Sequence, residues 1–324
     1  MRANLDRRLG LPILAYPAAS LLGRSVSEIL SSAESQAEAA VAVAKRIRAG
    51  AAFCFMDLSV EAEAFGARVK LGKDSIPVVA ANCLEGPKDI IALKVPCVGA
   101  ARTGIYLKGA SIASKRILDR PVYACLCGPY SAAWQMLGAR NIRKVCLENS
   151  KILELLLEKI SEFLVEYIRA YKREGASGIL LAEPLAGFLP PELNWKFSGK
   201  YVKKIVELVQ SSDFSIIYHT CADRAEDFAG QIFKTQACAF HFGEASNMEK
   251  IISIAPKDVM IMGNLRASDF ADKTPEYIEQ ASLGLLEKFG KFENYAISSG
   301  CDIPKDASWE NIDAFCNTVR LFYK

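Results

Sequence analysis

The chain has 324 residues, of which 51% are hydrophobic and 24% charged, and its formal net charge is +3. This balance is typical of a globular protein with a large core, and the scattered basic residues argue against a nucleic-acid-binding surface. No continuous apolar run reaches the roughly 18 residues that a membrane span needs, and the first residues lack an apolar signal segment. We therefore expect a cytoplasmic protein whose ten cysteines are thiols rather than disulfides.

Apolar runs of strand length alternate with longer helical patterns along almost the whole chain. The strand-like runs are Leu11–Tyr16, Ala52–Leu58, Val122–Cys127, Gly178–Glu183, Ser215–Cys221, Ala237–Phe242, Val259–Leu265 and Tyr295–Cys301. The helical patterns are Ser27–Ile47, Asn149–Lys172, Val202–Val209, Ala225–Ile232, Pro275–Lys288 and Trp309–Tyr323. Near-continuous apolar strands divided by helices indicate a parallel sheet covered on both faces. Eight such strands predict an α/β fold, a single (β/α)8 TIM barrel over residues 1–324.

Residues 61–120 depart from this alternation. They hold one hairpin-like strand, Ala67–Leu71, and a short helical pattern near Ala110–Ile117. We interpret this segment as an insertion between the second and third strands rather than as a second domain.

A histidine and a cysteine end the fifth strand-like run, as His219-Thr220-Cys221, and Cys301 ends the eighth. Residues i and i+2 of a strand point to the same face, with Cα atoms about 6–7 Å apart. In a barrel the carboxyl ends of all strands meet at the active-site face, so Cys301 can join the pair. An isolated His-x-Cys pair is a weak signal, but two thiolates and one imidazole with an open fourth position are typical of catalytic zinc. We therefore predict His219, Cys221 and Cys301 as zinc ligands.

Other polar side chains also fall at predicted strand exits. They are Asp57, Tyr130, Glu183, His241 and Asn264. We predict catalytic roles for Glu183, His241 and Asp57, and cofactor or acceptor binding for Asn264 and Tyr130. Three structural alternatives stay open: Asp57 pairing with a nearby arginine, Glu183 capping the next turn, and His241 as a satisfied wall histidine.

Several segments at these strand exits resemble one known family over essentially the whole chain. They are Phe55-Met-Asp-Leu-Ser-Val-Glu-Ala-Glu-Ala-Phe-Gly, Cys127-Gly-Pro-Tyr, Ala182-Glu-Pro, Ile217-Tyr-His-Thr-Cys, Met262-Gly-Asn and Ser299-Gly-Cys-Asp-Ile-Pro. The chain resembles the uroporphyrinogen decarboxylase superfamily, and within it the zinc methyltransferases of the methylcobamide:coenzyme M type. The family's zinc motif falls on His219, Cys221 and Cys301.

The resemblance implies a zinc enzyme that moves a methyl group between a corrinoid protein and a small acceptor or donor. Coenzyme M or another thiol, or tetrahydrofolate, would serve, in either direction, and His241 and Asn264 would orient it. Many methyltransferases of the family have Asp-Pro where this chain has Glu183-Pro184, so Glu183 is a candidate fourth ligand. The partners expected are a corrinoid protein and a small molecule, with a homodimer left open and neither nucleic acid nor membrane involved.

The alternative is a metal-independent decarboxylase of a tetrapyrrole or related acid. Asp57 lies about where decarboxylases of the family keep their essential aspartate. The arginine-rich segment that binds porphyrinogen carboxylates in those enzymes is replaced here by Ala15–Arg24, which lacks the arginine pair. A third reading is a corrinoid- or tetrapyrrole-binding chaperone without turnover.

Overall fold

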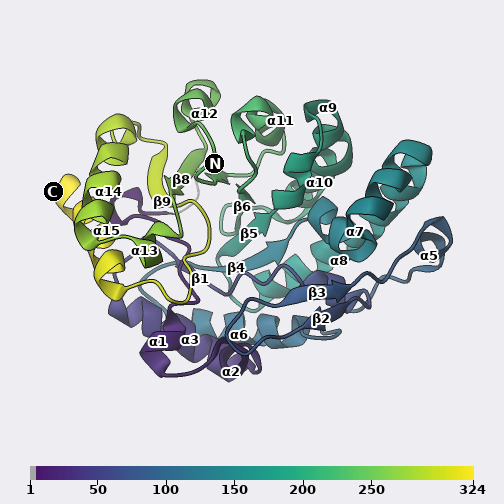
Figure 1. Cartoon of the computed structure of the whole chain (residues 1–324), viewed down its shortest axis with the longest axis horizontal. Helices are drawn as coiled ribbons and strands as arrows, with labels where there is room; N and C mark the ends of the chain where they lie inside the picture. The colour runs from purple at the N-terminus through teal and green to yellow at the C-terminus, as the bar shows by residue number, and fades with distance from the viewer. Residues whose placement is uncertain (1–4) are drawn as a thin grey trace.

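The computed structural model of the protein describes residues 5–324. Its centre is a curved, seven-stranded parallel sheet in the order β1-β4-β5-β6-β7-β8-β9, with helices arranged in an arc around its outer side (Figure 1). The strands are β1 (Ala52–Phe53), β4 (Val122–Cys127), β5 (Gly178–Ala182), β6 (Ser215–Thr220), β7 (Ala239–Phe242), β8 (Met260–Leu265) and β9 (Tyr295–Ser299). The predicted parallel α/β architecture is confirmed, with a barrel-like curl.

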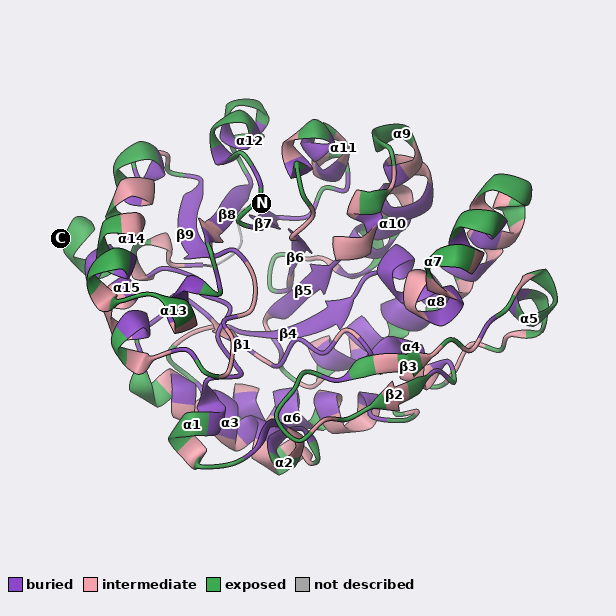
Figure 2. Ribbon diagram, viewed as in Figure 1, coloured by how far each residue is buried: buried purple, intermediate pink, exposed green. Residues whose placement is uncertain are grey.

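Burial on both faces explains why these strands are almost uniformly apolar. Every residue of β4, β5, β7 and β9 is buried, and the strands form the buried centre of the molecule in Figure 2. One face packs on the outer helices and the other lines the interior of the curled sheet, where Leu180, Ile217 and Met262 form part of a second buried cluster. A strand of alternating polar and apolar residues would bury polar side chains in one of these two layers, which is costly without hydrogen-bond partners.

Helices cover the outer face. The longer ones are α3 (Ala33–Arg46), α6 (Thr103–Arg116), α7 (Pro129–Glu148), α8 (Ser150–Arg173), α10 (Lys200–Val209), α14 (Pro275–Phe289) and α15 (Trp309–Phe322). The shorter ones are η1 (Arg7–Leu9), α1 (Ala18–Leu22), α2 (Val26–Leu30), α4 (Val60–Ala64), α5 (Pro87–Ala92), η2 (Pro184–Phe188), α9 (Pro191–Asn194), η3 (Trp195–Gly199), η4 (Ala225–Asp227), α11 (Ala229–Phe233), α12 (Met248–Ile254) and α13 (Asp269–Asp272). Within residues 5–324, no helix is long and apolar enough to span a membrane.

The predicted first strand is not a regular strand in the structure. Residues 11–16 run between β9 and β1, but the direct backbone contacts there are few. Leu11 N–H donates to the Ile297 carbonyl of β9 at 2.9 Å, and Gly50 N–H donates to the Gly10 carbonyl at 2.9 Å. Pro12 has no N–H to give a ladder, and Ile13 N–H bonds the Ser299 hydroxyl instead of a backbone carbonyl. The sheet therefore has seven regular strands rather than the eight we predicted.

The segment predicted as an insertion is more structured than expected. An antiparallel hairpin joins β2 (Arg68–Lys70) to β3 (Val78–Ala81), and α5 follows. The predicted short helix is the end of α6, which packs on α3 and on β4. Helix α6 therefore occupies the place of a crossover helix between β1 and β4, and the additional structure is the part that precedes it.

Helix α7, which the sequence pattern did not reveal, is kinked at Gly138 (φ 75°). The kink frees carbonyl groups, and the chain after β3 satisfies them. Asn82 Nδ2 donates to the Leu137 carbonyl at 3.1 Å, and Cys83 N–H donates to the Met136 carbonyl at 3.0 Å. A side chain at Gly138 would collide with Asn82, so the kink and the hairpin strand fit each other.

We predict that Gly178→Ala destabilises the protein. A Cβ at this first residue of β5 would collide with the backbone carbonyl of Ser215 and the ring of Tyr123, neither of which can move without disturbing the sheet. We expect a loss of about 1–3 kcal/mol in the free energy of unfolding, measured by urea denaturation.

Gly230→Ala is the control, because a Cβ there meets open space on α11. The control should be neutral or slightly stabilising. Equal losses in the two variants would contradict this account.

Candidate metal centre

The three predicted metal ligands lie together at the carboxyl ends of β6 and β9. One donor atom from each of His219, Cys221 and Cys301 falls within 4.8 Å of the others. Cys301 Sγ is 3.8 Å from His219 Nε2. The imidazole is buried, whereas both cysteines are partly exposed at the carboxyl ends of the strands, which we call the barrel mouth.

The donor set fits a tetrahedral metal ion. Zn–N and Zn–S bonds at the tetrahedral angle would separate nitrogen from sulfur by about 3.6 Å. The Cys301 thiol hydrogen-bonds to Cys221 and, with His219, lowers the pKa of Cys221, while that same contact raises the pKa of Cys301. A thiol whose pKa is lowered is more readily available as the thiolate that a metal ion binds.

A chain of hydrogen bonds sets the tautomer of His219. His241 Nε2 lies 2.8 Å from the Ser299 carbonyl, which can only accept, and 2.9 Å from the Ser298 hydroxyl, which gives its own proton to the Leu11 carbonyl. Nε2 of His241 must therefore carry a hydrogen. Burial lowers the pKa of His241, so its ring is neutral and its Nδ1 has a lone pair.

That lone pair lies 2.7 Å from His219 Nδ1, which must donate to it. In the tautomer that this contact favours, the lone pair of His219 is on Nε2, which faces Cys301 Sγ, as a metal ligand requires. His241 is fully buried and both of its nitrogens are engaged. The structure therefore gives His241 a positioning role behind His219 rather than a place against a substrate.

The turn after β7 brings the two cysteine-bearing loops together. A Cβ on Gly243 would lie 2.6 Å from the Cα of Cys221, and one on Gly300 would lie 2.7 Å from the backbone nitrogen of Glu244. Such close approaches need glycine at both positions. Asn264 Nδ2 donates at 3.0 Å to the carbonyls of Gly243 and Ser246, so the amide group of Asn264 holds this turn in place.

Glu183 is buried against the start of α7 rather than placed among the metal-ligand atoms. Its carboxylate accepts hydrogen bonds from Tyr130 N–H and Ser131 N–H, each at 2.9 Å, and from the hydroxyls of Ser131 at 2.7 Å and Ser198 at 3.1 Å. Burial raises the pKa of Glu183, and these bonds oppose the rise. A carboxylate at a helix N-terminus is favourable. Tyr130, itself buried, thus contributes its backbone here.

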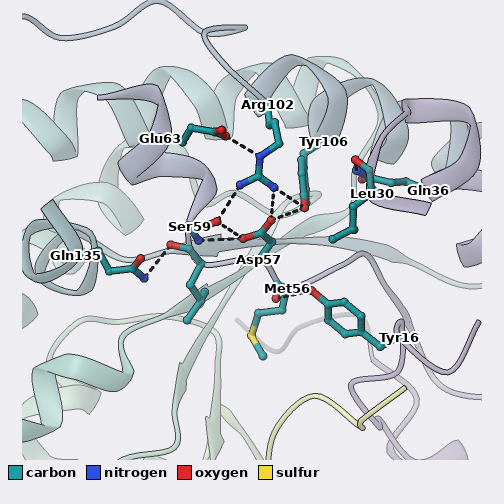
Figure 3. Close-up of polar contacts among 11 residues, drawn as sticks. Tyr16, Leu30, Gln36, Met56, Asp57, Ser59, Glu63, Arg102, Tyr106 and Gln135 are labelled. Carbon is teal, nitrogen blue, oxygen red and sulfur yellow. Dashed lines mark hydrogen bonds and ion pairs between the residues drawn. The ribbon is translucent and has the colours of Figure 1, made fainter. Parts of the chain in front are cut away.

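Asp57 lies at the exit of β1 in a closed polar network (Figure 3). Its Oδ1 accepts from the backbone N–H of Ser59 at 3.0 Å and from the hydroxyl of Ser59 at 2.6 Å. Its Oδ2 accepts from Tyr106 at 2.6 Å and forms an ion pair with Arg102. Arg102 also binds Glu63 at 2.6 Å. Asp57 is 1% exposed, so its carboxylate links the β1 exit to α6 and has no free face toward the mouth.

The model of the uroporphyrinogen decarboxylase (URO-D) family matches residues 7–322. The chain has a barrel-like sheet with a His-Cys-Cys group at its strand exits. It belongs to the uroporphyrinogen decarboxylase family. The resemblance stated from the sequence is confirmed.

Relatives with different activities share this family. Methylcobamide:CoM methyltransferase MtbA of Methanosarcina mazei is 26% identical over 71% of this chain and 69% of its own length. Uroporphyrinogen decarboxylase of Francisella philomiragia is 26% identical over 98% of this chain and 93% of its own length. A solved methyltransferase structure from Methanosarcina mazei matches with a TM-score of 0.85 and 21% identity, covering 100% of this chain and 95% of that one, which shows the shared fold.

We predict that His241→Ala weakens the binding of a metal ion at the His219, Cys221 and Cys301 group about 10- to 100-fold, the usual cost of losing a hydrogen-bond partner of a ligating histidine. Without His241, nothing fixes the proton on Nδ1 of His219. His241→Asn, whose amide oxygen can accept in place of Nδ1, should recover part of the affinity. Competition with a chromophoric chelator measures both variants, and wild-type affinity in His241→Ala would refute the positioning role.

We also predict that Arg102→Ala costs about 3–5 kcal/mol in the free energy of unfolding, because it leaves the buried charge of Asp57 unpaired. The matched control is Arg46→Ala. Arg46 pairs with Asp313 at the surface, where both side chains are 38% exposed, so its loss should cost less than about 1 kcal/mol. Similar losses for both variants in chemical denaturation would show that the Asp57 network does not anchor the structure.

Proposed function

We propose that the protein is a zinc-dependent methyltransferase that moves a methyl group between a corrinoid carried by a partner protein and a small acceptor or donor. The observation that carries the proposal is the His219, Cys221 and Cys301 group, whose donor atoms lie within 4.8 Å of one another and whose two cysteines are partly exposed. The similarity to methylcobamide:CoM methyltransferases supports the corrinoid.

The protein's own residues provide a ligand set with three occupied corners and a fourth left for the small molecule. His219 would supply a ring nitrogen, held by its hydrogen bond to His241, and the two cysteines would supply sulfur. Zinc, when bound, would keep an acceptor thiol deprotonated at neutral pH or polarise a nitrogen acceptor. The Asn264 amide, by holding the Gly243 turn, keeps the Cys221 side of the site in position.

Decarboxylation of a tetrapyrrole or related acid is the alternative. Relatives named as uroporphyrinogen decarboxylases keep it open, and one of them matches 98% of this chain. Two observations favour methyl transfer over it. Both oxygens of Asp57 are engaged by Ser59, Tyr106 and Arg102, and the decarboxylases' arginine pair is missing from Ala15–Arg24.

The test is zinc analysis together with a methyl-transfer assay. We expect purified protein to hold zinc and to demethylate methylcobalamin with a thiol or tetrahydrofolate acceptor, followed by the cobalt absorbance. Cys301→Ser should lower both zinc affinity and transfer by more than the about 100-fold that an outer hydrogen-bond partner is worth.

Cys97→Ser, at an exposed cysteine outside the site, should leave both unchanged. The proposal would be refuted if the purified protein held no zinc and Cys301→Ser kept full activity. Decarboxylation of uroporphyrinogen by the protein would also refute it.

A further inference from the structure

An apolar groove of about 450 Å³ lies between α7 and the segment that follows β5. Its walls include Tyr130, Trp134, Leu147, Phe188, Leu189 and Leu193. We call it the α7–η2 groove. Neither the metal ligands nor the residues that position them line it.

Two large apolar side chains of this groove are mostly in water. Leu147 is 81% exposed and Phe188 is 72% exposed. The Phe188 ring stacks on Trp134 with centroids 5.4 Å apart, so two segments distant in sequence build one aromatic surface. Exposed apolar side chains that gather in a concave surface, rather than singly, mark an interaction site.

The groove lies at the rim of the same end of the sheet as the metal group. Helix α7 begins directly after β4, and η2 begins directly after Glu183 at the exit of β5. Glu183 joins the two elements, because its carboxylate binds the first turn of α7 while its backbone N–H donates to the His219 carbonyl at 2.9 Å. A macromolecule that covers the barrel mouth from this side would therefore reach Phe188.

The charges around the groove are mainly positive. Arg143 lines it, and exposed Arg140 and Lys144 lie on the same half of α7, with exposed Lys151 at the start of α8. The exposed acids of this stretch and of α9 are Glu148 and Glu192. The surface therefore favours an acidic partner that presents an apolar side chain, since complementary charge speeds encounter and fixes orientation.

We propose that the α7–η2 groove docks the protein that delivers the corrinoid, through an apolar side chain on an acidic surface of that protein. The inference rests on the proposed function, which requires a methyl-carrying corrinoid to be brought to the mouth by another chain. Phe188 and Trp134 provide the apolar contact, and Arg143 provides the charge. These three residues are separate from His219, Cys221 and Cys301.

The test compares two methyl donors. The probes are free methylcobalamin and a purified corrinoid-binding protein charged with methylcobalamin. We expect Phe188→Ser and Arg143→Glu each to raise the KM for the charged protein about ten-fold or more, which is the scale of an interface residue that contributes strongly. Rates with free methylcobalamin should stay within about two-fold of wild type. Leu118→Ser is the control, since Leu118 is 85% exposed but precedes β4 at the opposite end of the sheet.

Three outcomes would overturn the inference, each in a distinct way. An unchanged KM for the charged protein in both variants removes the groove from docking. A raised KM for free methylcobalamin in Phe188→Ser would mean that the groove binds the corrinoid itself. Conversion of a dimer to a monomer in Phe188→Ser, seen by light scattering, would assign the groove to a second copy of this chain. Failure of wild type with both donors would instead refute the proposed function.

Discussion

The hydrogen bond between Nδ1 of His219 and Nδ1 of His241 is the interaction on which the candidate metal centre depends. It exists because β6 and β7 pair in a register that sets these two residues side by side. The chain of donors continues through His241 to Ser298 and Ser299 of β9, and from Ser298 to the Leu11 carbonyl. One proton arrangement therefore crosses β6, β7, β9 and the irregular first segment, and it ends in a lone pair on the metal-facing nitrogen of His219.

Two carboxylates near the same mouth, those of Glu183 and Asp57, have structural roles. Glu183 accepts hydrogen bonds from the buried N–H groups that begin α7, and Asp57 holds Arg102 and Tyr106 of the α6 region against the β1 exit. Both are buried, and each oxygen of each carboxylate has a partner. A polar residue at a strand exit is thus as apt to anchor the helix that follows as to meet a substrate, and burial with saturated hydrogen bonding separates the two uses.

The features that could be predicted depend on residues that are close together in the sequence. Strand β4 was predicted at its observed bounds because a fully buried strand needs an unbroken apolar run. The clustering of His219, Cys221 and Cys301 was predictable because His219 and Cys221 are two residues apart and Cys301 follows another strand. The first segment was overestimated because an apolar run does not show that Pro12 and a side-chain acceptor, Ser299, interrupt the ladder.

Features that depend on pairing between distant segments could not be predicted. The orientation of His241 follows from strand register and from Ser299, and neither can be inferred from neighbouring residues. Gly243 is required by the approach of Cys221, which belongs to another strand exit. The length of α7 was hidden because its periodicity breaks at Gly138, and the groups that satisfy the break come from Asn82 and Cys83 on the hairpin side.

The contact between Asn82 and the Gly138 kink sets the direction of the second half of α7. That half of α7 carries Arg143 and Leu147. Asn82 itself lines neither the groove nor the group of predicted metal ligands. A change at position 82 would therefore move the α7 wall of the groove and leave His219, Cys221 and Cys301 in place. If the groove docks a partner protein as proposed, a changed hairpin would alter the docking surface without any change at His219, Cys221 or Cys301.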